Sequence, residues 1–165
     1  MDARECVIVC GIDGSEGGRR ALEWAVAEAD RRGCRLRAVT VWSWDAGTAT
    51  ISPGEARNRA VELQNETLAT VVGQRLELAV ERRIAEGRPS EQVCAAAEDA
   101  ELIVLGSHGH GAVHDALVGS TSQHVIRHAP CPVVVLPDLR SAEREHKRAH
   151  AHHRLAQQQG TAPMF

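Results

Sequence analysis

Glycines and hydroxyl side chains gather in residues 106–121, where they could hold an anion. Four glycines let the backbone approach a ligand closely and direct N–H groups toward it: Gly106, Gly109, Gly111 and Gly119. Two hydroxyl residues, Ser120 and Thr121, follow at the expected start of a helix, whose free N–H groups and dipole suit an anion. The residues alone leave two interpretations open: a cradle for phosphates, or a flexible loop followed by an ordinary helix N-cap.

Asp13 is the second candidate, because its carboxylate directly follows an apolar run at residues 6–12. Its oxygens could accept hydrogen bonds from a sugar hydroxyl or a base amine. The alternative is that Asp13 only shapes the turn before Gly14. Ligands of an open α/β sheet bind where the winding of the strands reverses, and there the loops after the first and fourth strands would flank one crevice.

Histidines in the glycine-rich segment raise the question of a metal site. His108 and His110 are two residues apart, and His114 follows His110 at helical spacing. No cysteine or second cluster completes a ligand set, so we interpret them as solvent-exposed loop histidines. Four later histidines could bind a transition metal weakly, but we interpret them as part of a solvated, partly protonated tail: His146, His150, His152 and His153.

The segments that must position these residues alternate between strand and helix patterns. Short apolar or alternating runs predict strands at 6–12, 36–41, 78–84, 102–105 and 133–136. Capping residues and helical periodicity predict helices between Ser15 and Gly33, between Ser52 and Gly73, from Ser90 through Glu98, and over 120–129. This order predicts an α/β fold: a doubly wound parallel sheet of five strands, order 3-2-1-4-5, with helices on both faces and the strand at 78–84 at an edge.

Length and composition set the outer limits. A chain of 165 residues suits one domain, which we expect over 1–138, followed by an Arg/His/Gln-rich tail at 139–165 that we expect to be mobile. The net charge of −3 argues against a general nucleic-acid binder. No stretch is long and apolar enough for a membrane span, and the start does not resemble a signal peptide, so we expect a cytoplasmic protein without a membrane partner.

Lysine and cysteine usage narrows the chemistry further. The single lysine, Lys147, stands near the end of the chain, which excludes P-loop phosphate transfer and Schiff-base catalysis in the folded body. The cysteines form no CxxC pair, and their odd number predicts buried, reduced thiols: Cys6, Cys10, Cys34, Cys94 and Cys131.

Two other kinds of nucleotide site are disfavoured. A dinucleotide site needs GxGxxG after the first strand and an acid after the second, whereas this chain has Gly11-x-x-Gly14-x-x-Gly17 and Trp42-Ser43-Trp44. The HxGH element of nucleotidyltransferases belongs after the first strand, but His108-Gly109-His110 follows the fourth.

The spacing Gly106-x2-Gly109-x9-Gly119-Ser120 resembles the nucleotide-binding signature of the universal stress protein family, in its ATP-binding branch. Three further elements are similar to that family and occur in the right order: Asp13-Gly14-Ser15, Glu86-Gly87-Arg88-Pro89 and Ala129-Pro130-Cys131-Pro132-Val133-Val134-Val135. The likeness covers about residues 5–138.

This resemblance implies an ATP site with a role for each matching residue. Asp13 would contact the adenosine part, Val41 would offer its backbone to the adenine edge, and Gly11 and Ile12 would line the base pocket. The ribose and phosphates would be bordered by Leu105, Gly106 and Gly109, and the phosphates held by Gly119, Ser120, Thr121 and Ser122. Mg²⁺ or Mn²⁺ could accompany the phosphates.

The implied function is that of a regulatory module in stress response rather than of an efficient enzyme. Asp115, His110 and Ser120 are the only candidates in the loop for a base or nucleophile, and they form no recognised triad. Slow ATP hydrolysis at the same site is the alternative.

Two more expectations come from the resemblance. His108 and His110 stand where many members carry Arg or Lys, so phosphate binding could be weaker, or depend on pH near 6.5. The family dimerises through its last strand, which implies a homodimer through Val133–Leu136.

Overall fold

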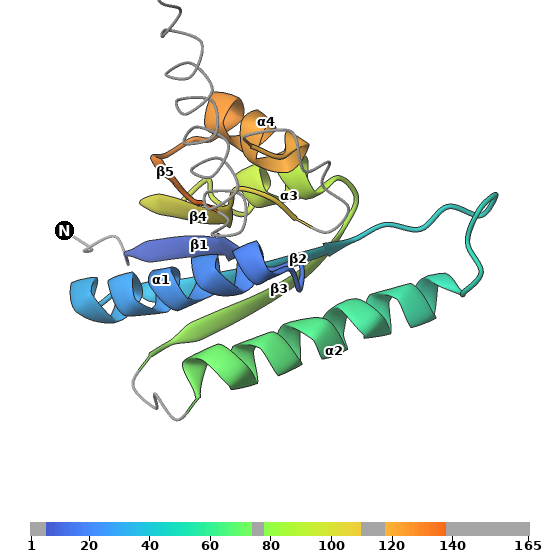
Figure 1. The fold of residues 1–165 in the computed structure, drawn as a ribbon, viewed down its shortest axis with the longest axis horizontal. Helices are drawn as coiled ribbons and strands as arrows, with labels where there is room; N and C mark the ends of the chain where they lie inside the picture. Colours follow the sequence, from blue (N-terminus) through green and yellow to red (C-terminus); the bar gives the residue numbers. More distant parts are fainter. Residues whose placement is uncertain (1–5, 74–77, 110–117, 138–165) are drawn as a thin grey trace, which may run out of the picture.

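A computed structural model of the chain describes residues 6–73, 78–109 and 118–137, and its centre is a parallel sheet of five strands (Figure 1). The strand order is β3-β2-β1-β4-β5, which confirms the predicted fold class. The strands are β1 (Val7–Gly11), β2 (Arg35–Trp42), β3 (Val80–Glu86), β4 (Leu102–Gly106) and β5 (Val133–Leu136). The expected tail at 139–165 lies outside the described residues.

Helices cover both faces of the sheet. Those in the described ranges are α1 (Glu16–Arg32), α2 (Pro53–Val72), α3 (Pro89–Ala95) and α4 (Ser120–His128). α1 and α2 lie on one face, and α3 and α4 lie on the other (Figure 1). None of these helices is long and apolar enough to cross a membrane.

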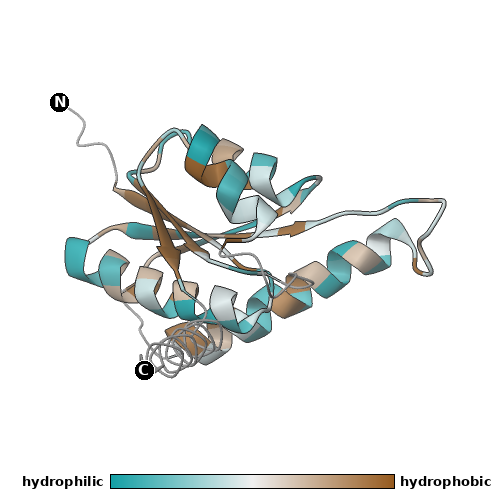
Figure 2. Ribbon diagram, turned by 45° about the horizontal axis from the view of Figure 1, so that its top comes forward, coloured by the Kyte–Doolittle hydropathy of each residue, from teal (hydrophilic) through white to brown (hydrophobic). Residues whose placement is uncertain are grey.

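The central strands form the core because both of their faces are covered. In β1, Ile8 and Cys10 pack into the cluster beneath α1 and α2, whereas Val7 and Val9 pack into the cluster beneath α3 and α4. Figure 2 shows hydrophobic residues along the central strands, and hydrophilic and hydrophobic residues mixed along the helices. Burial of such side chains stabilises the fold by about 25 cal/mol per Å² of apolar surface. The buried strand β1 therefore fixes the position of the loop that follows it and contains Asp13.

The ends of α1 are set by the residues that the sequence indicates. Ser15 Oγ accepts a hydrogen bond from the Gly18 N–H at 3.0 Å, which caps the first turn. The helix ends at Gly33, whose φ of +67° is a conformation that favours glycine. α2 begins in the same way after Ser52. α1 therefore begins at Glu16, shortly after Asp13 in the sequence.

Two elements differ in their bounds from the prediction. β3 spans Val80–Glu86 rather than 78–84, although it lies at the predicted edge of the sheet. α3 spans Pro89–Ala95 rather than 90–98, and its N-cap is Arg88, which makes no side-chain capping hydrogen bond. The fixed φ of Pro89 suits the first helical position, so Ser90 falls within the first turn instead of capping it.

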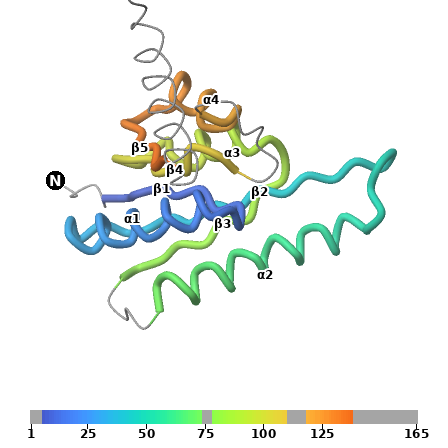
Figure 3. Tube along the Cα trace, viewed as in Figure 1, coloured from blue at the N-terminus to red at the C-terminus, as the bar shows by residue number. Residues whose placement is uncertain are grey.

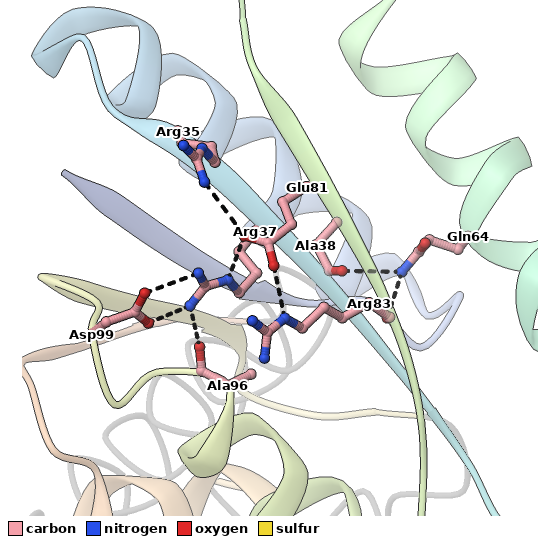
Figure 4. A network of polar contacts seen from close by, with 8 residues as sticks. All are labelled: Arg35, Arg37, Ala38, Gln64, Glu81, Arg83, Ala96 and Asp99. Atoms are coloured by element: carbon pink, nitrogen blue, oxygen red, sulfur yellow. Dashed lines mark hydrogen bonds and ion pairs between the residues drawn. The ribbon is translucent and has the colours of Figure 1, made fainter. Parts of the chain in front are cut away.

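An arginine buried under α3 fastens three elements together (Figure 4). Arg37 in β2 is only 4% exposed. Its guanidinium forms an ion pair with Asp99, donates to Glu81 Oε2 at 2.8 Å, and donates to the Ala96 carbonyl at 2.7 Å. On the other face of the sheet, Gln64 donates to the Ala38 carbonyl at 3.1 Å. These contacts satisfy polar groups that would be costly to bury alone.

The structure corrects the expectation that all cysteines are reduced. Cys6 and Cys34 form a disulfide, with their Cα atoms 4.6 Å apart. They directly precede β1 and β2, whose register pairs Val7 with Arg35. Cys10, Cys94 and Cys131 are free. The sequence spacing could not reveal the pair, because it arises only when the two strands lie side by side.

Candidate functional site

A cavity of about 970 Å³ lies beyond the carboxyl ends of β1, β2 and β4. It brings together the residues to which the family resemblance assigns a role: Gly11, Ile12, Asp13, Val41, Leu105, Gly106, Gly109, Gly119, Ser120, Thr121 and Ser122. These residues come from four separate segments of the chain.

The strand order explains why the cavity forms at this place. β1 and β4 are neighbours in the sheet although about ninety residues separate them in sequence (Figure 3). The helix after β1 covers one face and the helix after β4 covers the other. The loops after β1 and β4 therefore diverge at the carboxyl ends of the strands and leave a crevice between them. This is the usual position of the ligand in doubly wound folds.

Asp13 is held in place by the turn that follows it. Its Oδ1 accepts hydrogen bonds from the Ser15 N–H at 3.0 Å and from the Ser15 hydroxyl at 2.6 Å. The turn-shaping interpretation of Asp13 is therefore correct for this oxygen, and it is compatible with a ligand contact because the residue also lines the cavity. Asp13 is exposed enough to meet a ligand.

Glycines allow the β4 loop to approach Asp13 and α1. A Cβ atom at Gly109 would collide with Asp13 Oδ2, and one at Gly106 would lie 2.6 Å from the Gly17 carbonyl carbon. Any side chain at Gly106 would thus press on backbone that cannot easily move. Glycine at these two positions is a requirement of the close packing between the loop and the first turn of α1.

The start of α4 forms the other end of the cavity. The N–H groups in the first turn of a helix have no partners within it, so they can serve an anion. Ser120 is exposed and Thr121 is half-buried, and both line the cavity. Ser122 is buried and donates its hydroxyl hydrogen to the Gly106 carbonyl at 2.8 Å. Ser122 therefore ties α4 to the β4 loop and has only acceptor lone pairs left for a ligand.

Of the histidines in the glycine-rich segment, the structure describes only His108. His108 lines the cavity, and its Nδ1 lies 3.1 Å from the Ser107 hydroxyl. The segment with His110, Gly111, His114 and Asp115 lies outside the described residues. No group of three potential metal ligands occurs among the residues that the structure places.

One wall of the cavity was not expected from the sequence. α2 and the segment before it supply Ile51, Ala56, Arg59, Ala60 and Leu63. No motif marks these residues; Ala56, Ala60 and Leu63 share only a helical spacing that indicates a buried face. Arg59 pairs with Glu55 at 3.7 Å, and its side chain is 65% exposed. Arg59 is the one arginine or lysine of the described lining, and Asp13 is its one carboxylate.

The sequence of this chain is similar to a known protein family and to several of its members. The model of the universal stress protein family matches residues 7–137. A universal stress protein of Thermus aquaticus is 34% identical over 134 residues, which cover 78% of this chain and 96% of that protein. One from Mycolicibacterium smegmatis is 34% identical over 137 residues, which cover 78% of this chain and 45% of that protein. The chain thus spans about half the length of its mycobacterial relatives.

The solved structures agree with this result. The UspA protein from Lactobacillus plantarum matches with a TM-score of 0.58 and 28% sequence identity. The match covers 82% of this chain and 99% of that one.

Proposed function

Because the chain belongs to the universal stress protein family, we propose that it binds ATP in this cavity and acts as a nucleotide-dependent regulatory module in stress response. The observation that carries the proposal is the gathering of the glycine-rich loop, the start of α4 and Asp13 around one cavity. Solved universal stress proteins with this fold include one in complex with cAMP, at 20% identity and a TM-score of 0.52. Another, from Archaeoglobus fulgidus, is in complex with dAMP, at 23% identity and a TM-score of 0.51.

The proposed pose follows the chemistry of the cavity. The base lies near Gly11 and Ile12 with its edge toward the Val41 backbone, and the sugar lies near Asp13, whose oxygens accept hydrogen bonds. The phosphates lie between Gly109 and the start of α4, where N–H groups and the hydroxyls of Ser120 and Thr121 donate. Leu105, Gly106, Gly119 and Ser122 complete the borders.

A divalent ion fits this pose only through the nucleotide. The described lining holds one carboxylate, that of Asp13, and the described residues include no group of three potential metal ligands. Mg²⁺ or Mn²⁺ would be bound mainly by phosphate oxygens, with the hydroxyls of Ser120 and Thr121 as further oxygen ligands.

A regulatory module is favoured over an enzyme because hydrolysis needs a base aimed at a water beside the terminal phosphate. In the described lining the only carboxylate is that of Asp13, and it already accepts two hydrogen bonds from Ser15. Slow hydrolysis is the second candidate function. Bound ATP that is recovered intact after prolonged incubation favours the module, whereas steady phosphate release that is lost in Ser120→Ala favours the enzyme.

We also propose that the protein is a cytoplasmic homodimer that pairs through β5. Val133–Leu136 is an apolar strand at the edge of the sheet, and all four of its residues are half-buried in the single chain. An exposed apolar edge favours pairing with a second copy.

The binding proposal is tested by equilibrium titration with ATP. In Gly109→Ala, the added methyl displaces the Asp13 carboxylate, and in Ser120→Ala a hydroxyl contact to phosphate is lost. We expect either change to weaken ATP binding about tenfold, the usual cost of a hydrogen bond to a charged group. Gly54→Ala is the matched control, because a Cβ there meets nothing within 4 Å. An equal loss in the control, or wild-type protein that binds no ATP, would contradict the proposal.

A further inference from the structure

The only disulfide in the described part of the chain stands apart from the cavity, at the opposite end of the sheet. Cys6 precedes β1 and Cys34 precedes β2, and the Arg35 N–H donates to the Cys6 carbonyl at 2.9 Å. The ladder of the two parallel strands therefore brings the two sulfur atoms together. Cys34 is 4% exposed, whereas Cys6 is half-buried and reachable from solvent.

We propose that Cys6 and Cys34 are a reversible oxidation site that exchanges with disulfides of low molecular mass. The backbone ladder continues on both strands beyond the cysteines, so the two thiols stay adjacent when the bond is reduced. Ring closure then needs no search by a flexible chain. The Glu101 carboxylate lies 3.4 Å from Cys6 Sγ and can accept the hydrogen of its thiol in the reduced form.

The exchange has two balanced steps. The Cys6 thiolate attacks one sulfur of a small disulfide RS–SR, which forms a mixed disulfide at Cys6 and releases RS⁻. The Cys34 thiolate then attacks the Cys6 sulfur, forms the protein disulfide and releases the second RS⁻. One protein dithiol and one small disulfide thus give one protein disulfide and two small thiols, and an excess of small thiol reverses both steps.

The other cysteines are poorly suited to this exchange. Burial, with a smaller contribution from Asp13, raises the pKa of the Cys10 thiol, and burial also raises the pKa of Cys94. The pKa of Cys131 is raised by burial and by Cys94. A thiol with a raised pKa supplies little of the thiolate that reacts. We expect intramolecular oxidation at the start of β1 and β2, because Cys6 and Cys34 are the described cysteines whose sulfur atoms lie at bonding distance.

The bond has a structural consequence because of what lies between its ends. The closed loop contains the whole of β1, the Asp13 turn and α1. A cross-link across a loop of 28 residues restricts the unfolded chain and raises stability. For a domain of this size we expect the oxidised protein to melt roughly 10 °C higher than the reduced protein.

The test uses the full chain under native conditions. Protein is reduced with dithiothreitol, freed of it, and incubated with oxidised glutathione; free thiols are then alkylated and the peptides mapped by mass spectrometry. We expect a Cys6–Cys34 cross-link with loss of two hydrogens, higher thermal stability, and full reversal by dithiothreitol without denaturant. Cys94→Ser should behave like wild type, whereas Cys34→Ser should keep glutathione on Cys6.

Three results would overturn the proposal. Cys6 and Cys34 could both remain alkylatable after oxidised glutathione, the cross-link could join other cysteines, or the bond could resist dithiothreitol until the protein unfolds. The wild-type measurement decides each of these even where Cys34→Ser folds poorly. None of them depends on ATP binding.

Discussion

Single residues set the geometry of the cavity through the contact between Asp13 and the β4 loop. The Ser15 N–H and hydroxyl fix Oδ1, and Gly109 leaves just enough space beside Oδ2. Gly106 lets the same loop pack against Gly17 at the start of α1. These contacts pre-position the carboxylate and the loop, which lowers the cost of ordering them around a ligand.

Arg59 provides a prediction at this scale. It is a cation in the cavity wall, so we expect Arg59→Ala to weaken ATP binding roughly three- to tenfold by removing attraction for the polyphosphate. The loss should shrink at high salt. Arg57→Ala is the control, because Arg57 is exposed on the same helix and does not line this cavity. Equal effects of the two substitutions in an ATP titration would contradict an electrostatic role for Arg59.

At the scale of elements, Arg37 joins β2 to β3 and to the end of α3 (Figure 4). Arg37→Met should lower the free energy of unfolding by about 3 kcal/mol, because the Ala96 carbonyl loses its donor and Glu81 loses its buried partner, keeping Arg83 and Arg35. Urea unfolding monitored by circular dichroism measures this. Arg88→Ala is the control, since Arg88 is 81% exposed and pairs with Glu91 only at the surface. That change should cost less than about 1 kcal/mol, and a similar small loss for Arg37→Met would show that the buried network contributes little.

The same network gives a prediction for pH dependence. Hydrogen bonding to Arg37 lowers the pKa of Asp99. Burial raises the pKa of Glu81, but hydrogen bonds from Arg37 and Arg83 outweigh it, so the pKa is lowered overall. A carboxyl with a lowered pKa stabilises the fold above its unfolded pKa of about 4, and this contribution is lost as the pH falls. Between about pH 5 and pH 3, wild-type stability should therefore decline more steeply than that of Arg37→Met. Parallel curves would contradict this assignment.

The sequence was enough to predict the strands and helices, but not the side-chain contacts between them. The order of the strands follows from short apolar runs, and the ends of α1 follow from Ser15 and Gly33, because both signals are local. Arg37 breaks the apolar pattern of β2, and its partners Asp99 and Glu81 come from distant segments. The Cys6–Cys34 pair and Arg59 in the cavity wall were missed for the same reason, since only strand register and helix placement bring them to their positions.

At the scale of the whole molecule, the edges of the sheet decide how copies of the chain can meet. Val134 and Leu136 pack toward the cluster under α1 and α2, and Val133 packs toward the opposite cluster. Val135 belongs to neither cluster, so a change there should disturb pairing more than folding. We expect light scattering to show a dimer for wild type at micromolar concentration and a monomer for Val135→Lys. A monomeric wild type would contradict pairing through β5.

The central claim is that the crevice above β1 and β4 is an ATP site, and calorimetry of the wild-type chain with ATP tests it most directly. The account predicts saturable heat with one nucleotide per chain, and a melting temperature that rises with ATP concentration because the ligand binds only the folded state. Absence of heat, together with a melting temperature that does not move at millimolar ATP, would contradict it.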